Sequence, residues 1–119
     1  MHVIKTATDK AEGFLVLGMA VDAWESLEDL PTESKNHPRV LELRLECLVC
    51  LQDWQKAEIL GDSLAAILPG SVSVWWSLAR VRTQLGRREA ALEAIGRVVA
   101  LDASKRLEML NDPLLAGAF

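Results

Sequence analysis

Apolar positions along the chain recur every three or four residues, which is the spacing of an α-helix. The clearest stripe lies within residues 71–86, where Ser71 or Ser73 suits the helix N-cap and Gly86 suits its end. The apolar members of this stripe are Trp75, Leu78, Val81 and Leu85. No segment alternates apolar and polar residues over a useful length, which argues against strands. The pattern therefore predicts an all-α fold.

Further helices are predicted on both sides of this stripe. A second stripe after Gly86 runs through Ala91, Leu92, Ile95, Val98 and Val99. Upstream, Pro38 suits a first helical position, and a separate helix is predicted over residues 55–67, before Pro69. Near the end of the chain, Ser104 is suited to cap a short helix, and Asp112 with Pro113 to open one more turn. The helices thus come in pairs.

The paired helices repeat with a period of 34 residues. Four sets of equivalent positions share this period: Ala23, Ala57 and Ala91; Leu17, Leu51 and Leu85; Leu30, Leu64 and Val98; Gly18, Gln52 and Gly86. Four sets of positions that share one spacing are not expected by chance, so the period indicates a true repeat. Small alanine side chains allow two helices to cross closely, so each unit is predicted to be a helical hairpin. The units are residues 4–37, 38–71 and 72–105.

These residues resemble the tetratricopeptide repeat family, whose unit is two antiparallel helices. The third unit matches best, with Trp75, Leu78, Ala79, Gly86, Ala91, Ile95 and Val98 in register. In the first unit, Ala7 and Lys10 stand where side chains normally pack, so its first helix is expected to be short or frayed. The resemblance implies a single domain over residues 1–119. In it, three tandem helix-turn-helix hairpins would form a short right-handed superhelical array, with a short C-terminal cap over residues 106–119.

Composition excludes several classes of function. Thirteen basic and seventeen acidic residues give a net charge of −4, which counts against a nucleic-acid or anionic-membrane binder. Two cysteines exclude a disulfide framework. The longest apolar run, residues 13–21, is too short to span a bilayer and follows acidic residues, unlike a signal peptide. We therefore expect a cytoplasmic protein that is not bound to a membrane.

Candidate chemistry is sparse. Cys47 and Cys50 have the spacing of a redox dithiol, but both fall inside a predicted helix among leucines, where small buried hydrophobes are expected. His2 and His37 do not follow the cysteines at zinc-finger spacing, and His37 suits a solvated or capping position in a loop. No nucleophile elbow, phosphate loop or convergent carboxylate cluster is present. We expect no enzyme activity, no cofactor and no metal.

The remaining candidate is a binding surface, because in tetratricopeptide arrays the first helices line a concave groove that holds peptides or partner proteins. Positions 76, 80, 83 and 84 form a stripe beside the buried one. Equivalent positions in the second and first units follow by subtracting one or two periods of 34 residues. The predicted surface comprises Thr8, Glu12, Arg39, Glu42, Leu43, Glu46, Val49, Cys50, Trp76, Arg80, Thr83 and Gln84.

Trp76 is the most informative of these positions. Trp75 is expected to occupy the core, together with Trp24 and Trp54, so its neighbour points elsewhere. An indole beside Arg80 is typical of an interface hot spot, although a half-buried packing role for Trp76 explains the pattern equally well. Both interpretations stay open on the sequence alone.

The leading expectation is a non-enzymatic adaptor, scaffold or co-chaperone-like module that binds a protein or peptide in the groove. Docking of heat-shock chaperones is disfavoured. The tetratricopeptide proteins that bind them carry lysine, arginine or asparagine at groove positions where this sequence has Glu12, Glu46, Ser73 and Ser77. One alternative is a structural module that forms a homodimer through an apolar C-terminal end. The residues of that end are Leu114, Leu115, Ala118 and Phe119. A third, least favoured reading is a dithiol redox protein that uses the two cysteines.

Overall fold

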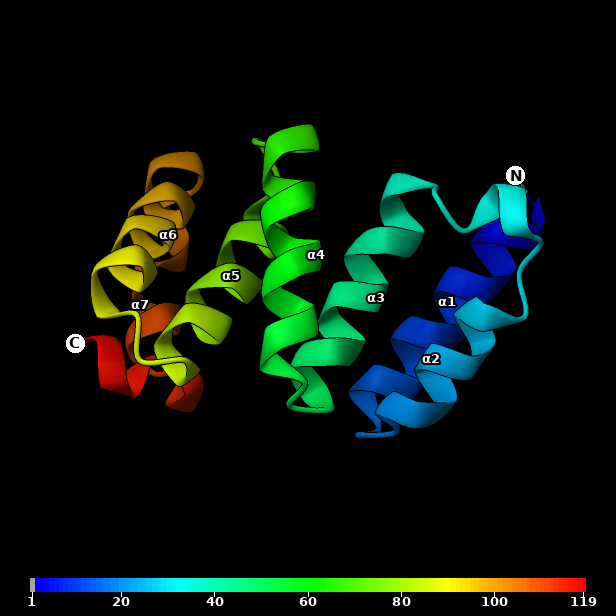
Figure 1. Ribbon diagram of the computed structural model, residues 1–119, viewed down its shortest axis with the longest axis horizontal. Coiled ribbons are helices and arrows are strands. Elements are labelled where there is room, and N and C mark those ends of the chain that lie inside the picture. Colours follow the sequence, from blue (N-terminus) through cyan, green and yellow to red (C-terminus); the bar gives the residue numbers. More distant parts are fainter. Residues whose placement is uncertain (1) are drawn as a thin grey trace. The chain divides into compact units, whose positions relative to one another are not determined.

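The computed structural model describes residues 2–119, and within that range every regular element is helical, as the apolar pattern predicts (Figure 1). The elements are α1 (His2–Val16), α2 (Ala20–Glu28), η1 (Thr32–Ser34), α3 (Pro38–Cys50), α4 (Trp54–Ile67), α5 (Val72–Gln84), α6 (Arg88–Leu101), η2 (Ala103–Lys105), α7 (Arg106–Leu110) and η3 (Pro113–Ala118). None of the helices described here is long and apolar enough to cross a membrane.

The chain divides into two compact units, Met1–Asp53 and Trp54–Phe119. The first holds α1, α2, η1 and α3, and the second holds the remaining elements. The boundary between them falls inside the predicted second repeat, residues 38–71. Its two helices, α3 and α4, therefore belong to different units.

In the first unit, α1 and α2 pack side by side, and both contact α3. Their shared core consists of Ala11, Ala23, Leu27, Leu30, Val40, Leu43 and Cys47, all buried. The expectation of a short or frayed first helix is wrong, because α1 spans 15 residues. Its buried Ala11 and partly buried Phe14 reach this core, which supplies packing that the residues at positions 7 and 10 do not predict.

In the second unit, α5 is central and packs on α4, α6 and η3. Ser71 caps it by accepting a hydrogen bond from the backbone N–H of Val74 at 3.2 Å, so the first of the two predicted caps is correct. Trp75 is buried, as predicted, and its indole N–H donates to the carbonyl of Pro69 at 2.8 Å. The guanidinium of Arg97 lies 5.2 Å from its ring. These contacts fix the rotation of α5 about its own axis.

The predicted period appears directly in the backbone. Gly18, Gln52 and Gly86 have φ values of 74°, 59° and 76°, the left-handed conformation that ends many helices. Each sits in the same pair of hydrogen bonds, in which its own N–H and that of the next residue donate back to the last helical turn. In the third case Gly86 donates to Thr83 at 3.0 Å and Arg87 to Arg82 at 2.8 Å. Three such turns at one spacing show that the repeat is structural.

The small residues of the repeat behave as predicted, whereas the tryptophans do so only in part. Ala23, Ala57 and Ala91 are all fully buried. Trp24 is only partly buried, packed against the core of the first unit with Arg44 4.6 Å from its ring, and Trp54 is also only partly buried. An indole is large enough to contact a core while its edge stays in solvent.

Candidate partner-binding surfaces

The side chains of Trp76 and Arg80 lie one turn apart on α5 and meet at one carboxylate. The indole N–H of Trp76 donates to Oδ2 of Asp112 at 2.7 Å, and Nε–H of Arg80 donates to the same oxygen at 2.6 Å. The guanidinium of Arg80 also lies 5.7 Å from the ring of Trp76. The pair therefore forms a receptor for a single anionic oxygen, built from neighbouring residues of one helix.

Asp112 is nearly excluded from water, with an exposed fraction of 7 %. Its second oxygen, Oδ1, accepts the backbone N–H of Leu114 at 2.9 Å and so caps η3. Burial by itself raises the pKa of this carboxyl, but the hydrogen bonds from Trp76, Arg80 and Leu114 outweigh that effect and hold the pKa below its usual range. Asp112 is thus held as a carboxylate at neutral pH.

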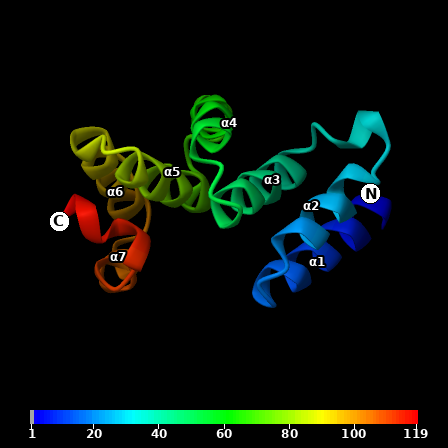
Figure 2. The same cartoon turned by 60° about the horizontal axis from the view of Figure 1, so that its bottom comes forward.

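The segment that follows Asp112 continues along α5. Gln84 donates through Nε2 to the carbonyl oxygen of Leu114 at 3.0 Å. A methyl group at Gly117 would lie 3.4 Å from Cγ2 of Thr83, so this glycine rests against α5. Leu115 and Ala118 are fully buried. Residues 112–118, which we call the tail segment, therefore lie against the face of α5 that carries Trp76, Arg80, Thr83 and Gln84. Figure 2 shows this end of the chain in red, beside α7.

These contacts revise the expectation for the third repeat. Trp76 is half-buried and hydrogen-bonded to Asp112, which agrees with the half-buried interpretation, whereas its role as an interface hot spot stays a prediction. Thr83 donates its hydroxyl to the carbonyl of Ala79 at 2.7 Å and offers only its methyl group. Asp112 was predicted as a cap for the last turn, and its bond to α5 has no signal in the sequence.

The exposed apolar C-terminal end is also only partly present. Leu115 and Ala118 fold back into the second unit, and Leu114 is half-buried. Phe119 remains 51 % exposed. The turn at Asp112 directs two of the four residues of the predicted apolar end inward, and a homodimer through the rest stays a prediction.

The first unit presents an acidic surface on α1 and α3. Arg39 pairs with Glu12 at 2.5 Å and with Glu42 at 3.9 Å, and Glu46 adds a further negative charge near the guanidinium. Burial alone lowers the pKa of Arg39, but the hydrogen bond and charge of Glu12, with the charges of Glu46 and Glu42, raise it overall. Three carboxylates around one guanidinium leave this group with a net charge of −2.

Three positions predicted to lie on the same surface are buried instead. Leu43 and Val49 have exposed fractions of 0 % and 3 %, and Thr8 one of 5 %. Leu43 belongs to the core shared by α1, α2 and α3. Thr8 donates its hydroxyl to the carbonyl of Lys5 at 3.1 Å. On α3 the prediction failed for Leu43 and Val49 because this helix buries apolar residues on more than one side. Cys50 is exposed, as that stripe requires.

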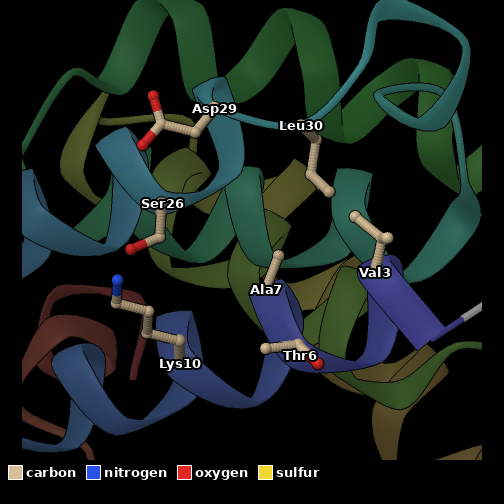
Figure 3. A pocket seen from close by; sticks show the side chains of 7 residues that line it. All are labelled: Val3, Thr6, Ala7, Lys10, Ser26, Asp29 and Leu30. Carbon is tan, nitrogen blue, oxygen red and sulfur yellow. The ribbon is translucent and has the colours of Figure 1, made fainter.

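A hollow of about 430 Å³ lies between α1 and α2 (Figure 3). It is lined by Val3, Thr6, Ala7, Lys10, Ser26, Asp29 and Leu30. The hollow lies where Ala7 and Lys10 stand at positions that larger apolar side chains fill in the repeat. These two departures from the repeat were the feature of the sequence that could have predicted it. The ammonium group of Lys10 turns toward the hydroxyl of Ser26. One ammonium and one carboxylate in the lining are too few charged groups to define a substrate.

The two thiols differ in their surroundings, and neither forms a disulfide. Cys47 is buried, and its burial, together with the charges of Cys50 and Glu46, raises its pKa to about 12. A redox dithiol needs the opposite shift. Among the side chains of residues 3–119, no three of histidine, cysteine or acidic type converge as metal ligands. His37 is a cap, as expected: its Nδ1 accepts the backbone N–H of Arg39 at 3.2 Å. His2 lies outside the residues whose side chains the structure describes.

The chain matches no protein-family model, no curated protein and no solved structure. The likeness to tetratricopeptide repeats therefore stays a resemblance of residues and spacing.

Proposed function

We propose that the chain is a non-enzymatic protein–protein interaction module. It binds a segment of a partner protein on the face of α5 that carries Trp76, Arg80 and Gln84, which we call the α5 face. One observation carries this proposal. The side chains of Trp76 and Arg80 already hold a carboxylate that another segment of polypeptide brings to them. A surface that binds one such segment has the donors required to bind another.

The chemistry of this surface suits peptide recognition. Both donors to the carboxylate are fixed on α5, whose rotation is set by the buried Trp75, so little order has to be created on binding. Hydrogen bonds between charged groups are stronger than neutral ones. Tryptophan and arginine are also the residues most enriched at interface hot spots. Gln84 adds a donor for the backbone of the bound segment.

The proposal extends to the array itself. Three left-handed turns at equivalent positions and three buried alanines support a tetratricopeptide-like stack of helical hairpins. In such a stack the face of α5 belongs to a peptide-binding groove. Within the first unit, the acidic group around Arg39 would favour basic residues of a partner.

A peptide titration tests the proposed function in the full-length chain. The chain would carry Asp112→Asn and Leu115→Ser, which weaken docking of its own tail segment; we call this variant the tail-released chain. The probe is a fluorescein-labelled nonapeptide with the sequence of residues 111–119. We expect saturable binding by fluorescence anisotropy, with a Kd on the order of 10 μM.

Two further substitutions provide matched controls. Adding Trp76→Phe keeps a ring but removes the N–H donor, and it should weaken binding at least about tenfold. Adding Trp24→Phe changes a tryptophan of the first unit that also lies against an arginine, and it should leave the affinity unchanged. Absence of saturable binding, or equal losses in both controls, would contradict the proposed function. Circular dichroism of each variant verifies that the helices persist.

A further inference from the structure

We propose that the α5 face selects partner segments that share the chemistry of the tail segment, and that the tail segment competes with them as a tethered ligand. The recognised pattern is a carboxylate, a backbone carbonyl two residues later that accepts a hydrogen bond, a leucine three residues later, and a small residue six residues later. This proposal rests on the proposed function, and it names the class of partner and the means of control.

The carboxylate is the first element of the pattern. Asp112 is the only charged residue in the buried class among the residues whose burial is described. It accepts two side-chain hydrogen bonds from α5, at 2.7 and 2.6 Å. A neutral side chain there would leave the half-buried guanidinium of Arg80 without its counter-charge. The site therefore favours an anion over a neutral group.

The positions after the carboxylate supply spacing. Two residues on, the carbonyl of Leu114 accepts from Gln84, a contact that any residue type can make. Three residues on, Leu115 is fully buried, so this position requires an apolar side chain. At the sixth position Ala118 is fully buried, so this site has no room for a large residue. At the fifth position Gly117 is exposed and contacts only the methyl group of Thr83, so this site is not selective. Phe119 remains exposed and is not selected.

Competition follows from the tether. The tail segment is joined to α7 through Asn111 alone, so it remains close to the face even when it is detached. A short tether gives an effective concentration in the millimolar range. A partner with micromolar affinity for the open face would therefore bind the parent chain only weakly. Release of the tail segment would raise the apparent affinity of the chain for the partner, although the contacts between the partner and α5 stay the same.

The experiment compares full-length chains against a small set of probe peptides. The chains are the parent, the tail-released chain and the single variant Asp112→Asn. If the double variant loses helicity, the single variant replaces it in the comparison. The reference peptide has the sequence of residues 111–119. Three altered peptides carry asparagine for the aspartate, serine for the second leucine, or serine for the initial asparagine, which is exposed in the chain.

We expect the first two alterations to weaken binding to the tail-released chain at least about tenfold, and the third by less than about twofold. We also expect the parent chain to bind the reference peptide at least about tenfold more weakly than the tail-released chain. Equal affinity of all four peptides would overturn the recognised pattern. Equal affinity of the parent and tail-released chains would overturn the competition.

A random dodecapeptide library, selected on the tail-released chain, separates this proposal from the proposed function. Selected peptides that need Trp76 and carry the carboxylate-to-leucine spacing support both. Peptides that need Trp76 but lack the spacing contradict only the pattern inferred here. Failure to select any peptide that depends on Trp76 contradicts both. A larger particle by light scattering in the parent would show exchange of tail segments between copies, which contradicts a tail held within one chain.

Discussion

At the scale of single residues, Gln52 adopts a backbone conformation that the repeat otherwise assigns to glycine. Its φ of 59° places a side chain in the left-handed region, which Gly18 and Gly86 occupy without a Cβ. A left-handed conformation costs an ordinary residue about 1–2 kcal/mol. The turn holds because the N–H groups of Gln52 and Asp53 still close on α3.

Replacing this residue should therefore stabilise the protein. Gln52→Gly removes the left-handed strain at the cost of extra freedom in the unfolded chain, for a net gain of about 0.5–1 kcal/mol. Gln55→Gly, inside α4 and equally exposed, should instead lose about 0.5 kcal/mol. Chemical denaturation measures both. A loss of stability in Gln52→Gly would show that the turn does not carry this strain.

The buried alanines make a second prediction at this scale. Ala91 lies on α6 at the contact with α5 and has no exposed surface. Ala91→Leu should overpack that contact and lower the free energy of unfolding by about 1–3 kcal/mol. Ala100→Leu, on the exposed side of the same helix, should change it by less than about 0.5 kcal/mol. Equal melting temperatures for the two variants would contradict the close crossing of α5 and α6.

The two cysteines should differ sharply in reactivity. Cys50 is exposed, whereas burial raises the pKa of Cys47 to about 12. At pH 8, titration of the folded protein with a disulfide reagent should detect one fast thiol, and Cys50→Ala should remove it. The second thiol should appear only in denaturant. Fast reaction of both thiols in the folded state would revive the dithiol interpretation.

At the scale of elements, residue spacing predicted most of the helices because their ends have local causes. Pro38 begins α3, Ser71 caps α5, and Asp112 with Pro113 opens η3, as residue types at those positions indicate. The cap near residue 104 was misplaced by two residues, because Asp102 accepts the N–H of Ser104. Each of these features depends on a few consecutive residues.

Docking of η3 on α5 could not be predicted in this way. It joins Asp112 to residues more than 30 positions earlier, and nothing in the local sequence pairs them. The period predicted that Trp76, Arg80 and Gln84 share a face of α5. It carried no information on what covers that face, since the tail segment lies outside the repeat.

The tail segment should be released by acid. The pKa of Asp112 is lowered in the folded state, so its docking contributes stability above the unfolded value of about 3.9, and that contribution is lost as the pH falls through the folded pKa. The free energy of unfolding of the parent should therefore exceed that of Asp112→Asn at pH 7, and the two should converge below about pH 4. Asp29→Asn, at an exposed position, is the control. A difference independent of pH would show that the charge does not hold the tail.

At the scale of the whole molecule, the repeat predicted one continuous array, and the chain divides into two units at Asp53. Periodicity assigns equivalent positions to each repeat, but it does not determine which neighbouring helices pack most closely. Each unit carries one part of the predicted surface. The acidic group around Arg39 belongs to the first unit, and the carboxylate receptor on α5 belongs to the second.

The indole N–H resonance of Trp76, followed in the full-length protein, tests the central claim most directly. In the parent this group donates to the carboxylate of Asp112, so its resonance should move when the tail is released by Asp112→Asn and Leu115→Ser. Adding the peptide of residues 111–119 should return it toward the parent position and leave the indole resonance of Trp24 unchanged. The account would be contradicted by a Trp76 resonance at the same position in the parent and the tail-released chain, or by one that does not shift when the peptide is added.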